Sequence, residues 1–181
     1  MNQIKILLLR GVNVAGANRL PMPEFREMLA ELGLAQVQTH IQSGNAVFVD
    51  PSIADLADKI KAAMLSRFGF APPQFSLSKA EFEAIAKANP YAAQAKADGA
   101  KVHVFFLSEP VAATETVKYR AMLAAGEDVA FTDKAIYLLA PHGIGRSVIA
   151  EKLDKSAKTR MTGRNYNSVE SILALARGIT V

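Results

Sequence analysis

The chain has 181 residues, of which 50% are hydrophobic and 21% charged, so it can bury a core and disorder is excluded as its main state. The absence of cysteine excludes disulfides, thiolate metal sites and cysteine nucleophiles. The net charge of +4 equals the excess between Lys152 and Arg164, where five basic residues stand against one acidic residue. Because there is no signal peptide pattern and no run of about 18 apolar residues, we expect a cytoplasmic protein without a membrane partner.

The first part of the chain has the pattern β-α-β-β-α-β. Strands are predicted at 4–9, 36–41, 46–49 and 74–77, and the two helices run from Pro21 to Gly33 and from about Ser52 to Gly69. Ser52 followed by Asp55 predicts a capping box. The turn Gln42-Ser43-Gly44-Asn45 suits a tight hairpin.

The pattern then repeats after a linking helix, which Ser78 and Glu81 cap and which ends before Pro90. A strand at 102–107, a helix at 110–123, a hairpin at 129–140 and helices from Ser147 and Asn167 follow, without a clear final strand. We therefore expect an α+β protein of two consecutive ferredoxin-like (βαββαβ-type) units, with antiparallel or mixed sheets and helices on one face. The units are residues 1–78 and 101–181, and 79–100 connect them.

This topology brings the loop after the first strand and the first hairpin turn to the same end of the sheet. Both loops are polar, and we expect them to form a ligand-binding surface. Its candidate residues are Arg10, Asn13, Asn18, Arg19, Gln42, Ser43 and Asn45.

Two later segments offer further candidates. The loop 143–147 presents Arg146 at a helix start, where N–H groups and a guanidinium suit a phosphate or carboxylate, although a glycine turn capped by Ser147 is an equally good interpretation. The polar stretch 159–168 adds Arg160, Arg164 and Asn165, and Asn165 could instead cap the last helix.

The three histidines, His40, His103 and His142, have no metal-ligand spacing, so we predict no metal site and no cofactor. His103 stands within an apolar strand, which favours a hydrogen-bonded structural role.

Three blocks of sequence resemble the bacterial domain of unknown function 1697 family. They are 8–14 with Pro21-Met22, the run from His40 to Asn45, and a late Arg164-Asn165-Tyr166-Asn167-Ser168. In the late block Tyr166 replaces a tryptophan of the family and Ser168 a threonine, and Gly163 precedes Arg164 where the family tends to have threonine. The resemblance implies a tandem ferredoxin-like α+β fold and supplies no established activity.

The leading hypothesis is a binding module for a phosphate-bearing ligand, either a small molecule such as a nucleotide or a nucleic acid. One alternative is an enzyme that acts on a small phosphorylated or carboxylate ligand. Another is a protein-interaction module in which the polar loops are purely structural. The oligomeric state does not follow from the sequence.

Overall fold

The structure is a computed structural model that describes residues 2–14, 16–155 and 160–180. Contacts divide the chain into two units, of which the first contains Met1–Glu83 and Ser171–Val181 and the second contains Ala84–Glu170. This division differs from the expected boundaries in two respects. The connecting segment 79–100 is divided between the units after Glu83, and the C-terminal half of the last helix groups with the first unit.

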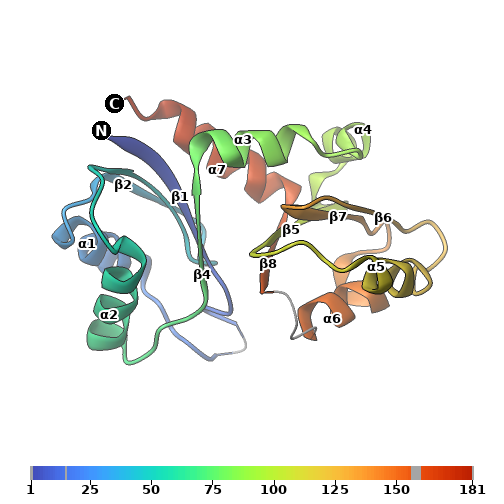
Figure 1. The fold of residues 1–181 in the computed structure, drawn as a ribbon, viewed down its shortest axis with the longest axis horizontal. Coiled ribbons are helices and arrows are strands. Elements are labelled where there is room, and N and C mark those ends of the chain that lie inside the picture. Colours follow the sequence, from blue (N-terminus) through green and yellow to red (C-terminus); the bar gives the residue numbers. More distant parts are fainter. Residues whose placement is uncertain (1, 15, 156–159, 181) are drawn as a thin grey trace. The chain divides into compact units, whose positions relative to one another are not determined.

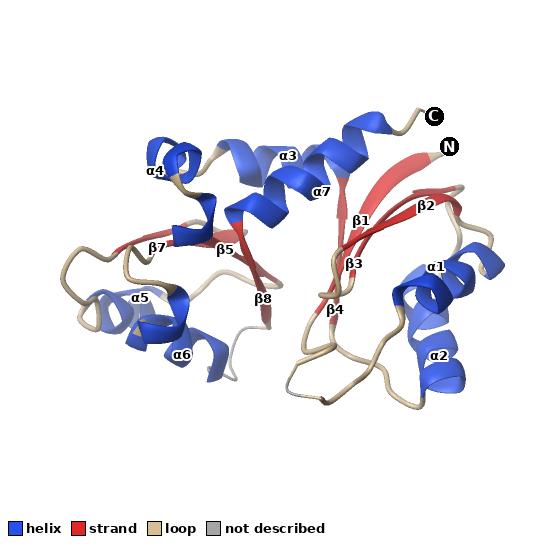
Figure 2. Cartoon of the chain, turned by 180° about the vertical axis from the view of Figure 1, so that it is seen from behind, coloured by secondary structure: helices blue, strands red, loops and turns tan. Residues whose placement is uncertain are grey.

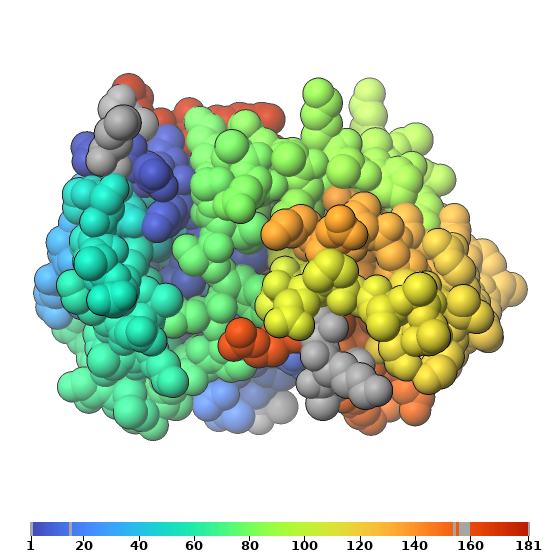
Figure 3. All heavy atoms as spheres, viewed as in Figure 1, coloured from blue at the N-terminus to red at the C-terminus, as the bar shows by residue number. Residues whose placement is uncertain are grey.

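A four-stranded antiparallel sheet forms the centre of the first unit, with the strand order β2-β3-β1-β4. Its elements are β1 (Gln3–Leu9), α1 (Met22–Glu31), β2 (Ala35–His40), β3 (Asn45–Asp50), α2 (Leu56–Phe68) and β4 (Gln74–Ser78). Both helices lie on one face of the sheet (Figure 1). In the space-filling view α2, drawn in teal, forms part of the surface of this unit (Figure 3).

The core between this sheet and its helices follows from the alternation of side chains along each strand. Leu7 and Leu9 of β1 point to the same face as Phe48 of β3, and all three are buried against the helices. From α1, Phe25 and Leu29 reach the same core because they lie four residues apart on one helix face. Each such side chain contributes about 1.5–3 kcal/mol on burial.

The second sheet is also four-stranded and antiparallel, with the order β6-β7-β5-β8. The remaining elements are α3 (Lys79–Lys87), α4 (Ala92–Ala97), η1 (Gly99–Lys101), β5 (Val102–Leu107), α5 (Ala113–Arg120), β6 (Asp128–Phe131), β7 (Ala135–Leu139), η2 (Ile144–Arg146), α6 (Val148–Lys155), β8 (Met161–Asn165) and α7 (Tyr166–Gly178). Helices α5 and α6 lie on one face of this sheet and α4 on the other (Figure 2). Their core includes Phe105, Ile136, Leu138, Ile149 and Leu153.

Several local predictions are confirmed. The two sheets establish the mixed α+β class, and the strand predicted at 102–107 has the observed bounds. Gly33 and Gly69 follow their helices with φ angles of +89° and +77°. The capping box is present, because the Ser78 N–H donates to Glu81 Oε2 at 2.8 Å and the Glu81 N–H donates to Ser78 Oγ at 3.2 Å.

The second unit does have a final strand, which the sequence analysis missed. Residues Met161–Asn165 form β8 and pair with β5, whereas the sequence indicates only a polar stretch with ligand-binding candidates at this position. Its residues are mostly polar, yet Met161, Thr162 and Arg164 are buried. The strand depends on pairing with a distant apolar neighbour, so its own composition does not reveal it.

The capping box expected at Ser52 and Asp55 is wrong. Asp55 stands before α2 with a φ of +53° and its side chain makes no capping hydrogen bond. Asp50 holds this turn instead, because its Oδ1 accepts hydrogen bonds from the N–H groups of Ser52 at 2.9 Å and Ile53 at 2.8 Å. Helix α5 also begins at Ala113 rather than at Pro110.

Candidate functional site

The two polar loops of the first unit meet, as the topology predicted. The N–H of Leu9 donates to the carbonyl of Gly44 at 2.9 Å, which ties the end of β1 to the hairpin turn. Asn13 continues this junction, because its Nδ2 donates to the carbonyl of Gln42 at 2.8 Å. Segments about thirty residues apart therefore form one loop cluster, made of residues 10–14, 16–20 and 41–45.

The asparagine side chains of the loop cluster are engaged in holding it together. Asn13 Nδ2 also donates to the carbonyl of Leu20 at 3.0 Å, and Asn13 Oδ1 accepts from the Leu20 N–H at 2.8 Å. Asn18 Nδ2 donates to the carbonyl of Gly11 at 2.9 Å. These amides satisfy backbone groups that would otherwise need water, so their contacts are structural.

In the hairpin turn between β2 and β3, an asparagine side chain likewise holds the backbone in place. Asn45 is fully buried, and its Nδ2 donates to the carbonyl of His40 at 3.2 Å and to Ser43 Oγ at 2.9 Å. Arg10 is half-buried and has a partner within the protein. Arg19 and Gln42 are exposed at the surface of the loop cluster. Their role in ligand binding stays a prediction.

The candidates in the second unit do not share one environment. Arg164 lies on β8 and is 8% exposed, and its Nη1 donates to Thr162 Oγ1 at 2.9 Å and to the carbonyl of Gly163 at 2.8 Å. Burial lowers the pKa of Arg164 to about 10. Asn165 Oδ1 accepts from the Ser168 N–H at 2.9 Å and caps α7, while Arg160 is exposed.

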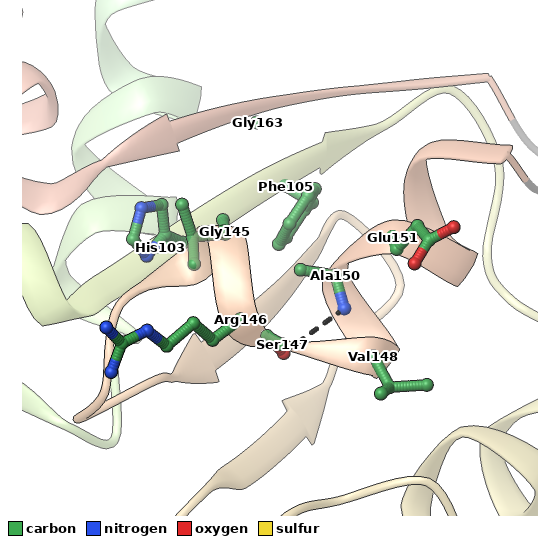
Figure 4. A pocket seen from close by; sticks show the side chains of 10 residues that line it. His103, Phe105, Gly145, Arg146, Ser147, Val148, Ala150, Glu151 and Gly163 are labelled. Atoms are coloured by element: carbon green, nitrogen blue, oxygen red, sulfur yellow. Dashed lines mark hydrogen bonds between the residues drawn. The ribbon is translucent and has the colours of Figure 1, made fainter.

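A pocket of about 640 Å³ lies between the sheet of the second unit and the start of α6 (Figure 4). It contains Arg146, the predicted residue of the 143–147 loop. The full lining comes from β5, the η2–α6 segment and β8, and consists of His103, Phe105, Ile144, Gly145, Arg146, Ser147, Val148, Ala150, Glu151 and Gly163. The size of the pocket suits a small molecule.

The start of α6 forms one side of this pocket. Ser147 Oγ accepts from the N–H of Ala150 at 3.3 Å, which confirms the capping interpretation of Ser147. Val148, which lines the pocket, is the first helical residue, and its N–H group has no carbonyl partner within the helix. Arg146, which Ser147 separates from the helix, is exposed and brings a positive charge. Ser147 therefore accounts for the N–H of Ala150.

Phe105 forms part of the apolar wall of the pocket, and Gly163 makes room for its ring. A Cβ placed on Gly163 would lie 2.9 Å from Phe105 Cε1. Any other residue at this position of β8 would therefore require the ring of Phe105 or the strand to shift.

His103 is the most unusual residue of the pocket. It is 7% exposed, and its buried Nδ1 has no hydrogen-bond partner among the described residues, which corrects the expected hydrogen-bonded role. Burial lowers the pKa of His103 to about 4, so the imidazole is neutral at pH 7. A buried polar atom without a partner costs about 1–3 kcal/mol.

The lowered pKa of His103 predicts a pH dependence of stability. Since the unfolded state takes up this proton near pH 6.5 and the folded state near pH 4, stability falls as the pH decreases through this interval. Between pH 7 and pH 5 the loss is about 2 kcal/mol. We expect His103→Gln to flatten the urea-unfolding free energy over this range.

His40 offers the control, because burial also lowers its pKa but the residue is only partly buried. His40→Gln is expected to change the pH dependence less than His103→Gln does. A His103→Gln variant with the pH dependence of the original protein would contradict the neutral, buried state of His103.

Sequence reasoning identified the 143–147 loop and missed its partners. The sequence favours a structural role for His103 and does not single out Glu151 as a site residue. The period of two along a strand puts His103 and Phe105 on one face, which was a usable signal. That this face meets the start of α6 depends on the packing.

Within the part of the chain that the structure describes, no group of three His, Cys, Asp or Glu side chains is placed to hold a metal ion. No helix in the same ranges is long and apolar enough to cross a bilayer.

The two antiparallel sheets with their helices define an α+β protein of two β/α units, with one ligand-sized pocket described in the second unit. The chain belongs to the family described as Protein of unknown function (DUF1697), whose family model matches residues 1–137. It is similar in structure to the conserved bacterial protein SP0830 from Streptococcus pneumoniae. The TM-score is 0.75, the identity is 25%, and the match covers 97% of this chain and 99% of that one. No curated protein matches the chain.

Proposed function

We propose that the chain is a binding protein for a small ligand that carries a phosphate or carboxylate group, held in the pocket at the start of α6. The observation that carries the proposal is the buried His103 Nδ1, which has no partner among the described residues and belongs to a residue that lines this pocket. A neutral imidazole can donate one hydrogen bond to an oxyanion.

The surroundings of His103 support an anionic ligand. Backbone N–H groups at a helix start, together with the helix dipole, stabilise negative charge. Arg146 adds a planar guanidinium that can make two parallel hydrogen bonds to a phosphate or carboxylate. Arg146, the first helical residue Val148 and His103 thus line one pocket.

The loop cluster of the first unit supports this function less well. The side-chain amides of Asn13, Asn18 and Asn45 are hydrogen-bonded within the loop cluster itself. In the second unit, the candidate Arg164 is buried on β8. A nucleic acid would need a track of exposed cations along its backbone. The pocket needs only one anionic group, so we favour a small ligand.

The ionisable groups of the pocket favour binding over acid–base catalysis. His103 has a pKa of about 4, and the hydrogen bond from Lys155 lowers the pKa of Glu151. A general base works best with a pKa close to the working pH. Both groups are weak bases at neutral pH.

We also propose the ferredoxin-like assignment for both units. The orders β2-β3-β1-β4 and β6-β7-β5-β8, with one helix in each crossover connection, support this name.

The proposal is tested by thermal denaturation in phosphate, sulfate and acetate, with sodium chloride at matched ionic strength. A ligand at ten times its dissociation constant adds about 1.4 kcal/mol, which raises the midpoint of a chain of this size by about 3–6 °C. We expect this increase to disappear in Arg146→Gln.

Arg160→Gln is the matched control, because Arg160 is an exposed arginine of the same unit that does not line the pocket. It should keep the increase. Equal increases in both variants and in sodium chloride would indicate a general salt effect. No increase with any oxyanion would make the polar groups of the pocket structural and the proposal wrong.

A further inference from the structure

The pocket carries opposite charges at its two ends. Figure 4 places Arg146 and His103 at one end and the carboxylate of Glu151 at the other. A ligand with only an anionic group would be attracted by Arg146 and repelled by Glu151. The charge pattern therefore favours a ligand that carries a positive group as well as an anionic one.

Glu151 is ionised and its present partner is easily displaced. Its Oε1 accepts a hydrogen bond from Lys155 Nζ at 2.6 Å, and this contact lowers the pKa of Glu151. Both side chains are largely exposed, at 61% for Glu151 and 69% for Lys155. Exposed ion pairs of this kind contribute little to stability, so a cation on a ligand can compete with Lys155.

The wall between the two ends is apolar. Phe105 and Ala150 form its buried part, while Ile144 is 37% exposed and Val148 is 51% exposed. The aliphatic part of a ligand can therefore lie along this apolar wall.

We infer that the ligand is a short zwitterion whose anionic group lies at Arg146 and the start of α6 and whose protonated amine lies at Glu151. This class contains amino acids and aminoalkyl phosphates. The inference rests on the proposed function, because it assigns the second end of the same ligand. Lys155 leaves Glu151 when the amine binds.

The test compares ligands that differ only in the amine, namely β-alanine against propionate and phosphoethanolamine against ethyl phosphate. Dissociation constants are measured by isothermal titration calorimetry at pH 7. An exposed ion pair predicts a two- to fivefold preference for each amine, at about 0.5–1 kcal/mol. Glu151→Gln should abolish this preference without weakening the binding of propionate, and Arg146→Gln should weaken all four ligands.

Lys155→Gln serves as the control and should keep or increase the preference, because it frees Glu151. Equal affinity for both members of each pair, with binding still dependent on Arg146, would overturn the zwitterion and leave the proposed function intact. A preference that persists in Glu151→Gln would overturn it too. No binding of any of the four ligands would contradict both proposals.

Discussion

Replacing Gly44 by alanine is expected to lower the free energy of unfolding by about 3 kcal/mol or more. Gly44 has a φ of +70°, and a left-handed conformation costs other residues about 1–2 kcal/mol. A Cβ at this position would also lie 2.8 Å from Leu9 Cβ and 2.8 Å from Val12 Cγ2. Both neighbours are buried in the core, and such overpacking costs about 1–3 kcal/mol.

Gly11→Ala is the matched control for Gly44→Ala in urea denaturation. Gly11 has nearly the same φ, +71°, but an added Cβ would meet no atom within 4 Å. We expect only the backbone cost, about 1–2 kcal/mol. Equal losses in the two variants would show that Leu9 and Val12 move aside without cost, and would contradict the close packing of the loop cluster.

Asp50→Ala is expected to destabilise the protein by about 3 kcal/mol or more. Asp50 is 1% exposed, and its Oδ2 lies 2.7 Å from Lys5 Nζ. Its Oδ1 accepts from the N–H groups of Ser52 and Ile53. Removing one partner of a buried ion pair costs about 3–5 kcal/mol, and the two donors lose their acceptor as well. Because Lys5 is partly exposed, we expect the loss of stability to lie near the lower end of this range.

Asp50→Asn separates the two contributions, because it keeps an acceptor for the turn and removes the charge. It should cost less than Asp50→Ala in the same urea measurement at pH 7. An equal cost would assign the whole effect to the ion pair with Lys5.

The pH dependence of this pair has a defined sign. Burial raises the pKa of Asp50, but Lys5 and the N–H groups of Ile53 and Ser52 outweigh it, so the pKa is lowered from 3.8. The stabilisation is therefore complete above about pH 4 and is lost as the pH falls through the folded-state pKa. The difference between the original protein and Asp50→Asn should shrink in acid, and a constant difference would contradict the charged state.

Most of the fold was readable from the sequence because it depends on local periodicity. The apolar runs at 4–9 and 102–107 mark the buried central strands, and Gly33 and Gly69 end helices because glycine adopts a positive φ without strain. Even the meeting of the two polar loops followed, since a β-α-β-β unit has few allowed connections.

The role of a polar residue was not readable, because it depends on partners distant in the chain. Asn13 and Asn45 resemble ligand-binding residues in the sequence, and in the structure their amides bond to loop carbonyls and a serine hydroxyl. Arg164 belongs to a dense polar stretch, and pairing with β5 makes that stretch a strand. The burial and the hydrogen bonds of these polar side chains depend on segments that come together only in the folded protein.

The sequence by itself determined the α+β class, the repeated order of strands and helices, and the polar loop that ends in Ser147. Only the tertiary structure decided that this loop meets His103 across a pocket, that Asp50 holds the turn before α2, and that the second sheet closes with β8. The physical reason is the range of the interactions. Propensity, periodicity and capping act within a few residues, whereas desolvation and the pairing of polar groups are settled only when distant segments pack.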